Sequence, residues 1–148
     1  MAYTQILLHF VFSVKYREPV LKKDWRDRLY QYMIAIIQKH KHKVLAIGGT
    51  DDHVHILVGF HPTETISSLM LEVKRDSSKW INENKFLNRQ FAWQSSYGAF
   101  SYSKSQLDQV VQYIHNQEEH HKTKSYEDEF KLLLDKYEIK YNEIYLFE

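Results

Sequence analysis

The chain has 148 residues, of which 43% are hydrophobic and 26% are charged, with a formal net charge of +1. This length and apolar content predict one compact domain over residues 1–148 and exclude a disordered or fibrous chain, while the small net charge permits a polyanionic partner without requiring one. The absence of cysteine excludes a disulfide framework, a thiolate metal site and a cysteine nucleophile.

Membrane and secretory signals are also missing from the sequence. No apolar run approaches the ~20 residues that a membrane-spanning helix needs, and the first residues lack the basic region of a secretory signal. We therefore expect a cytoplasmic protein with no membrane partner.

Hydrophobic periodicity predicts the secondary structure of the first half of the chain. Over residues 5–14 both the even and the odd positions are mostly apolar, which predicts a central strand that is buried on both faces. Apolar residues at spacings of three and four predict a helix over about 22–42. The apolar runs 44–47 and 52–60 predict two strands, which the turn residues between them join into an antiparallel hairpin.

The second half continues the alternation of helix and strand. Pro62 with Thr63 or Thr65 predicts the start of a second helix that extends to Ile81, and aromatic residues within 91–102 predict a fourth strand. The order β-α-β-β-α-β predicts an α+β fold, a ferredoxin-like sandwich with an antiparallel sheet. A capping-box pattern from Ser105 to Asp108 predicts a third helix to about residue 121, and apolar residues over 132–139 predict a last helix.

Two histidines stand at the start of the strand predicted over residues 52–60. Because side chains alternate along a strand, His53 and His55 project to the same side, about 6.6–7 Å apart. Leu57 and Gly59 lie on the same side of the strand as the two histidines, so we expect this side to be covered. Two imidazoles can converge on one divalent ion, but a solvent-facing pair is also common, so ligation requires further partners.

A stripe of polar and aromatic residues follows in the third predicted helix. Tyr113, Gln117 and His120 or His121 are spaced by three or four residues, which places them on one side of the helix. Taken alone, Tyr113 is expected to be a packing residue, because its phenol, with a pKa of about 10, is a poor nucleophile until it is activated.

These motifs occur in a recognisable order along nearly the whole chain. They are LHFVF at residues 8–12, KYR at 15–17, DHVH at 52–55, YGAFS at 97–101 and a Tyr-x-x-x-Gln pattern at 113–117. In this order and at this length, the chain resembles the single-tyrosine HUH transposases of bacterial insertion sequences, including the REP-associated tyrosine transposases.

The resemblance implies a role for each matching residue. His53, His55 and Gln117 would be metal ligands and Tyr113 the nucleophile, with Glu118 or His121 as alternatives to Gln117. Mg²⁺ or Mn²⁺ is implied, because a hard ion with open positions accepts a phosphate oxygen.

The resemblance also implies a reaction and its partners. The family cleaves and rejoins single-stranded DNA through a 5′-phosphotyrosine and recognises a DNA hairpin near the element's end. It works as a homodimer, and in some members the tyrosine comes from the partner chain's helix, so the resemblance leaves open whether Tyr113 acts in its own chain or in the partner. For phosphate contacts we expect Lys15, Arg17, Lys74, Arg75 and Lys79, and for base stacking Tyr16, Trp93 and Tyr97, although each has an ordinary role as a solvated or core residue.

Two other classes of protein share part of this pattern. Histidine-triad hydrolases are excluded, because Leu57 stands where their pattern needs a third histidine. The alternative function is a non-catalytic ferredoxin-like module that binds single-stranded nucleic acid, in which Tyr113 has no special role; the chain lacks the ribonucleoprotein signature of such modules.

Overall fold

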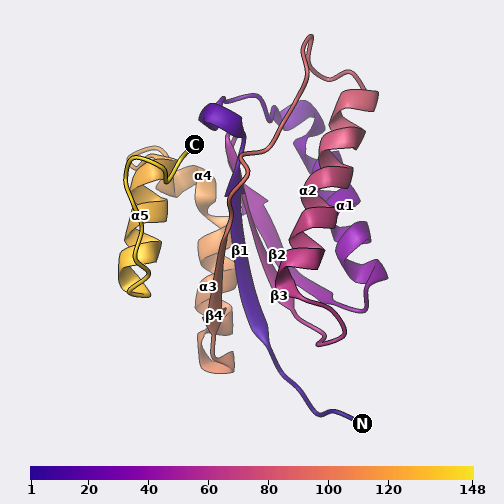
Figure 1. Cartoon of the computed structure of the whole chain (residues 1–148), viewed down its shortest axis with the longest axis vertical. Helices are drawn as coiled ribbons and strands as arrows, with labels where there is room; N and C mark the ends of the chain where they lie inside the picture. Colours follow the sequence, from indigo (N-terminus) through magenta and orange to yellow (C-terminus); the bar gives the residue numbers. More distant parts are fainter.

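A four-stranded antiparallel sheet lies between two layers of helices in the computed structural model, which describes residues 1–148 (Figure 1). The strands are β1 (Leu7–Ser13), β2 (Lys43–Gly49), β3 (His53–Gly59) and β4 (Gly98–Tyr102). Their order across the sheet is β2-β3-β1-β4, with every neighbouring pair antiparallel. This is the arrangement of a ferredoxin-like split β-α-β sandwich, so the predicted α+β fold is confirmed.

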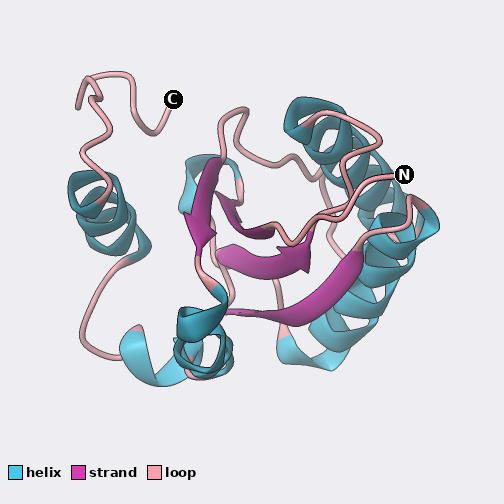
Figure 2. Ribbon diagram, turned by 90° about the horizontal axis from the view of Figure 1, so that it is seen from below, coloured by secondary structure: helices cyan, strands magenta, loops and turns pink.

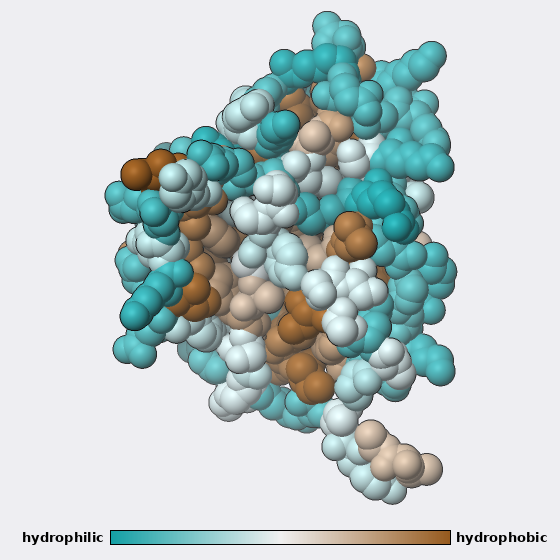
Figure 3. All heavy atoms as spheres, in the orientation of Figure 1, coloured by the Kyte–Doolittle hydropathy of each residue, from teal (hydrophilic) through white to brown (hydrophobic).

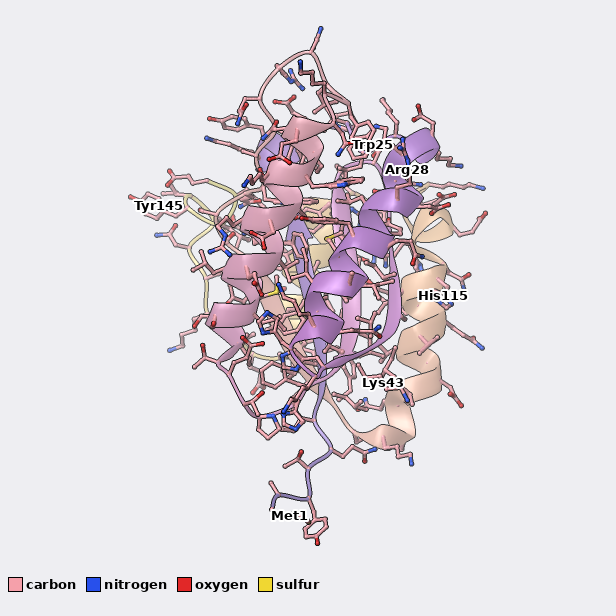
Figure 4. All side chains as sticks on the ribbon, turned by 90° about the vertical axis from the view of Figure 1, so that its right-hand side faces the viewer. Met1, Trp25, Arg28, Lys43, His115 and Tyr145 are labelled. Carbon is pink, nitrogen blue, oxygen red and sulfur yellow. The ribbon has the colours of Figure 1, made fainter.

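The first helical layer consists of α1 (Lys23–Lys39) and α2 (Ile66–Glu83), and Figure 2 shows it on one side of the sheet. Alternate residues of β1 and β3 pack against its apolar stripe and form the largest core. At one end of this layer Trp25 stacks on Phe86 with ring centroids 4.6 Å apart, and the Arg28 guanidinium lies beside Trp25 and over the same Phe86 ring (Figure 4). Thr65 caps α2 by accepting a hydrogen bond of 3.0 Å from the Ser68 amide, so Thr65 rather than Thr63 opens the helix.

The second helical layer covers the opposite side of the sheet. It consists of α3 (Leu107–His115), α4 (Gln117–His120) and α5 (Tyr126–Lys136). Val11 and Leu57 of the sheet are fully buried beneath these helices, together with both histidines of β3. The prediction that the histidine side of β3 is covered is therefore confirmed.

On the face seen in Figure 3, hydrophilic residues dominate the rim and hydrophobic patches lie between residues of intermediate hydropathy near the middle. Two short 3₁₀ helices, η1 (Lys15–Arg17) and η2 (Lys104–Gln106), complete the secondary structure. None of the helices is long and apolar enough to cross a bilayer.

The third helix begins and ends differently from the prediction. Ser103 and Gln106 form the capping box and open η2, whereas the Ser105 hydroxyl contacts that of Ser103 at 2.7 Å instead of capping Asp108. The predicted continuous helix to residue 121 is also wrong, because Asn116 leaves the helical region with φ −97° and ψ 19°. Asparagine is a weak helix former that tolerates such conformations. A separate short helix, α4, therefore begins at Gln117.

The fourth strand and the last helix are shifted from their predicted positions. Only residues 98–102 of the aromatic segment join the sheet, while Trp93 forms a single bridge with Val14. Ser125 caps α5 by accepting a hydrogen bond of 3.2 Å from the Asp128 amide, so this helix starts earlier than the apolar residues 132–139 indicated.

The close approach of α3 to β2 depends on Gly48. A methyl group at this position would lie 2.4 Å from the Ile114 carbonyl oxygen, which belongs to helix backbone and cannot move alone. We expect Gly48→Ala to lower the free energy of unfolding by about 1–3 kcal/mol in urea denaturation. Gly59→Ala is the control, since its nearest contact would be an ordinary 3.7 Å, and equal losses in the two variants would contradict this packing.

Candidate metal and nucleophile site

His53 and His55 point from β3 into the space between the sheet and the second helical layer. Both side chains are completely buried. Their neighbours across the sheet, Ser13 and Val11 of β1, lie directly opposite them in the strand register. The alternation of the strand thus places two imidazoles side by side in a closed layer, as predicted.

Glu129 of α5 brings a carboxylate to these two rings. Its Oε1 lies 2.9 Å from His55 Nε2 and 3.5 Å from His53 Nε2. One ligand atom from each of the three residues lies within 4.8 Å of the others, and all three residues are buried. A buried carboxylate beside two imidazole nitrogens is a donor set that suits a divalent cation, so this group can hold a metal ion.

The second nitrogen of each histidine has its own partner. His53 Nδ1 lies 2.6 Å from Asp52 Oδ1, which also accepts a 3.0 Å hydrogen bond from the Thr50 hydroxyl. His55 Nδ1 lies 2.7 Å from Nε2 of His9, a buried residue of β1. Both Nδ1 atoms are therefore engaged, and both Nε2 atoms face Glu129, as in metal sites whose histidines are oriented by outer partners.

Gln117 lies at the site, as predicted. Its Oε1 is 2.9 Å from His53 Nε2, and its Nε2 donates a 3.0 Å hydrogen bond to Glu129 Oε2. Its role as a metal ligand stays a prediction. Of the two alternatives, His121 lies 3.1 Å from Glu129 Oε1, whereas Glu118 points away and pairs with Arg26 at 2.6 Å.

Tyr113 of α3 meets the same carboxylate from the other side. Its phenol donates a hydrogen bond to Glu129 Oε2, while Glu129 Oε1 contacts His55. The Tyr113 ring lies across the edge of the His55 ring, with centroids 5.8 Å apart. A single carboxylate therefore joins the candidate nucleophile to the candidate metal ligands.

Burial and charge set the protonation of the site. Burial lowers the pKa of His55 to about 4 against the opposing pull of Glu129, and burial together with His55 lowers the pKa of His9 well below its ordinary value. Although burial opposes it, hydrogen bonds from His121 and His55 hold the pKa of Glu129 well below its usual range. Burial and the negative charge of Glu129 raise the pKa of Tyr113 well above its ordinary value, so the phenol keeps its proton in this arrangement.

The charge of Glu129 can be tested through His121. Burial tends to lower the pKa of His121, but Glu129 outweighs it and raises that pKa above the ordinary value. Glu129→Gln removes the negative charge that favours the protonated imidazole, so we expect the pKa of His121 to fall. An NMR titration of the histidine ring protons measures it, and an unchanged His121 pKa would contradict the contact.

The basic residues predicted to contact DNA do not gather at this site. Lys74, Arg75 and Lys79 belong to α2, which covers the opposite side of the sheet. Lys74 donates to three backbone carbonyl oxygens of residues 94–96, and burial lowers its pKa to about 8. Arg17 donates a 2.7 Å hydrogen bond to the Phe147 carbonyl, and the Lys15 ammonium lies 5.5 Å from the Tyr16 ring centroid.

The aromatic candidates for base stacking are divided between core and surface. Trp93 is buried and donates to the Ser77 hydroxyl at 2.9 Å, which leaves no face for a base. Tyr16 is exposed, and Tyr97 is partly buried beside the α2 layer.

Two cavities reach residues of the site. The larger, of about 520 Å³, reaches Tyr113 and Glu129 and includes Tyr102, Lys124 and Lys136 in its wall. The smaller, of about 440 Å³, reaches Asp52 and His121 and is lined by further basic residues, which are Lys22, Lys23, Arg26, Lys122 and Lys124. Lys124, in the segment between α4 and α5, lines both cavities.

The sequence contained a signal for the two residues that were missed. Glu129 lies in an otherwise apolar stripe of α5 with Tyr126, Phe130 and Leu133, and a carboxylate is rarely buried without a partner. His9 likewise interrupts an apolar strand. Neither signal names the partner, because Glu129 is 74 residues from His55 and His9 is 46 residues from it.

Comparison with known proteins identifies the family. The family described as IS200-like transposases matches residues 2–117. The chain belongs to this family. The matched segment contains both strand histidines, Tyr113 and Gln117, whereas Glu129 and the whole of α5 lie beyond it.

Individual transposases are similar to the chain in sequence and in fold. The chain is 25% identical over 118 residues to the ISDra2 transposase TnpA of Deinococcus radiodurans, covering 76% of this chain and 84% of that protein. A crystal structure of a transposase from Deinococcus radiodurans R1 has a TM-score of 0.64 and 25% identity, covering 78% of this chain and 93% of the other. A REP-associated tyrosine transposase bound to a REP hairpin has the same fold, with a TM-score of 0.62 at 16% identity, covering 82% of this chain and 72% of the other. Membership of a transposase family makes this chain an enzyme that acts on DNA, and the resemblance predicted from the sequence is confirmed.

Proposed function

We propose that this transposase cleaves and rejoins single-stranded DNA through a covalent 5′-phosphotyrosine at Tyr113, with a divalent cation held by the β3 histidines. The observation that carries the proposal is the convergence of Tyr113, His53 and His55 on the Glu129 carboxylate. A nucleophile and a cation site at one point are what an in-line attack on a phosphodiester requires.

The metal is proposed to be Mg²⁺ or Mn²⁺. His53 and His55 would hold it with Glu129, and Gln117 is placed to offer its amide oxygen. When bound, such a cation supplies positive charge that polarises the scissile phosphate and stabilises charge in the transition state.

The chain's own residues carry out the covalent step. The Tyr113 oxygen attacks phosphorus as its proton passes to Glu129 Oε2, a P–O bond to Tyr113 forms, and the P–O3′ bond breaks to leave a 3′-hydroxyl once that oxygen has taken a proton from water. The phenol proton has Glu129 Oε2 as its hydrogen-bond acceptor in this structure. Rejoining is the reverse step, in which a 3′-hydroxyl attacks the phosphotyrosine and no external energy source is needed.

The DNA strand is proposed to reach Tyr113 through the larger cavity and to continue into the smaller one, which shares Lys124 with it. Lys124 and Lys136 provide positive charge in the larger cavity, where Tyr102 offers an aromatic ring. A cationic groove with an aromatic wall suits single-stranded nucleic acid. The predicted contacts of Lys15, Arg17 and the three α2 cations would then lie on a more distant part of the DNA, such as a hairpin stem.

The same geometry supports a proposal about which chain supplies the tyrosine. Tyr113 reaches the carboxylate beside the histidines of its own chain, so we propose that the tyrosine acts within one chain and that residues 1–148 form one transposase domain. A homodimer and recognition of a hairpin at element ends remain predictions from the family resemblance.

Covalent capture of DNA tests the proposal. The protein is incubated with Mn²⁺ and single-stranded DNA that contains a hairpin and its flanking sequence from the host genome, with a label at either end. We expect an adduct stable in denaturant that retains the label 3′ of the break and releases a fragment with a free 3′-hydroxyl. Binding without an adduct under all metal conditions would favour the alternative, a non-catalytic single-stranded nucleic-acid-binding module.

A further inference from the structure

A chain of hydrogen bonds leads away from His55 through the sheet. His55 Nδ1 lies 2.7 Å from His9 Nε2, and His9 Nδ1 lies 3.4 Å from the Tyr102 hydroxyl. The three residues come from the neighbouring strands β3, β1 and β4, all on the side of the sheet that faces the second helical layer. His9 and His55 are fully buried, whereas Tyr102 is only partly buried and lines the larger cavity.

The direction of this chain follows from its end at Glu129. A carboxylate only accepts hydrogen bonds, so His55 Nε2, at 2.9 Å from Glu129 Oε1, carries the proton. A neutral imidazole has one proton, so His55 Nδ1 accepts from His9 Nε2. His9 Nδ1 then accepts from the Tyr102 hydroxyl.

A metal ion at Nε2 requires the opposite direction. The ion needs the lone pair of His55 Nε2, so the proton of His55 must sit on Nδ1. This proton needs an acceptor, and the only group facing it is His9 Nε2. His9 must therefore carry its own proton on Nδ1 and donate to Tyr102.

We propose that His9 and Tyr102 form a reversible hydrogen-bond relay that switches the tautomer of His55 when the metal binds. The proposal rests on the metal site of the proposed function. When the ion binds, the proton on His55 Nε2 leaves to solvent, and His55 Nδ1 takes the proton of His9 Nε2. His9 Nδ1 then takes the hydroxyl proton of Tyr102. Tyr102 regains a proton from solvent through the cavity. Each group carries one proton before and after, and His9 is a positioning residue that does not touch the substrate.

The neighbouring histidine shows why a relay is needed at one ring only. His53 Nδ1 faces the Asp52 carboxylate at 2.6 Å, and a carboxylate accepts in both states, so it keeps a proton on Nδ1. His55 is backed by an imidazole, which both donates and accepts. The two ligands thus have a fixed and a reversible partner.

The test is the ¹⁵N NMR spectrum of histidine-labelled protein before and after one equivalent of Zn²⁺, a diamagnetic probe. We expect the protonated nitrogen to change from Nε2 to Nδ1 in both His55 and His9, at the same point of the titration. A tautomer of His9 that stays the same while His55 binds Zn²⁺ would overturn the relay and leave the metal site intact. Failure of the wild-type protein to bind either Zn²⁺ or Mn²⁺ would overturn both.

Variants of His9 give a second readout, the affinity for Mn²⁺ measured by electron paramagnetic resonance. His9→Phe keeps the ring shape but removes the acceptor, and we expect affinity to fall about 10- to 100-fold. His9→Gln restores an acceptor and is expected to recover most of the loss, which a purely packing role would not allow. His42→Phe, a buried imidazole that stacks on Phe60 and bonds to Glu64, is the matched control and should bind as the wild type does. Wild-type affinity in a folded His9→Phe protein would contradict the relay.

Discussion

Tyr113→Phe is expected to abolish the covalent DNA adduct while leaving DNA binding, metal binding and folding unchanged. The substitution removes one oxygen from a half-buried ring whose phenol donates a hydrogen bond to the Glu129 carboxylate. Loss of a nucleophile that forms a covalent intermediate lowers the rate by about 10⁴-fold or more. The adduct is measured by denaturing gel electrophoresis, and DNA and Mn²⁺ binding are measured on the same preparation.

Tyr145→Phe makes the same chemical change at an exposed position, where the side chain points into solvent (Figure 4). This variant should form the adduct at the wild-type rate. An adduct that persists at the wild-type level in Tyr113→Phe would assign the covalent link to another residue and remove Tyr113 from the mechanism.

Glu129→Gln is expected to cause the largest loss of metal affinity among single substitutions outside the two histidines. The change keeps the size of the side chain but removes the negative charge that lies 2.9 Å from His55 Nε2 and 3.5 Å from His53 Nε2. Loss of an outer partner of a metal site costs about 10- to 100-fold in affinity, and we expect loss of this ligand to exceed that range. Isothermal titration with Mn²⁺ measures the change.

Two further variants separate Glu129 from its neighbours. Glu127→Gln alters the same kind of side chain on α5, but at a partly exposed position where Glu127 lies 4.0 Å from Arg17, and this variant should bind Mn²⁺ as the wild type does. Gln117→Ala should weaken binding less than Glu129→Gln, because an amide oxygen carries no net charge. If the order of these two effects is reversed, Gln117 rather than Glu129 is the main third ligand.

The sequence predicted those features that depend on local pattern. Strand periodicity placed His53 and His55 on one side of β3, and the shared parity of Leu57 indicated that this side is covered. Helical spacing with the family resemblance brought Tyr113 and Gln117 to the same site. Periodicity was sufficient here because the two histidines belong to one strand, and Tyr113 and Gln117 are only four residues apart on either side of the break at Asn116.

The features that escaped prediction depend on contacts between distant segments. Asn116 breaks the helix between Tyr113 and Gln117, and a local pattern of apolar residues does not register such a turn. Glu129 and His9 reach His55 only because α5 and β1 pack against β3 in the folded chain. The segment that supplies Glu129 also lies outside the part of the chain that the family matches, so the resemblance offered no guide to it.

The central claim is that one divalent cation binds beside the Tyr113 hydroxyl, between the two β3 histidines and Glu129. Anomalous diffraction from crystals soaked in Mn²⁺ locates the ion directly. We predict a single strong peak within coordination distance of His53 Nε2, His55 Nε2 and a Glu129 carboxylate oxygen. A fully occupied Mn²⁺ position elsewhere, with no peak between these three side chains, would contradict the claim.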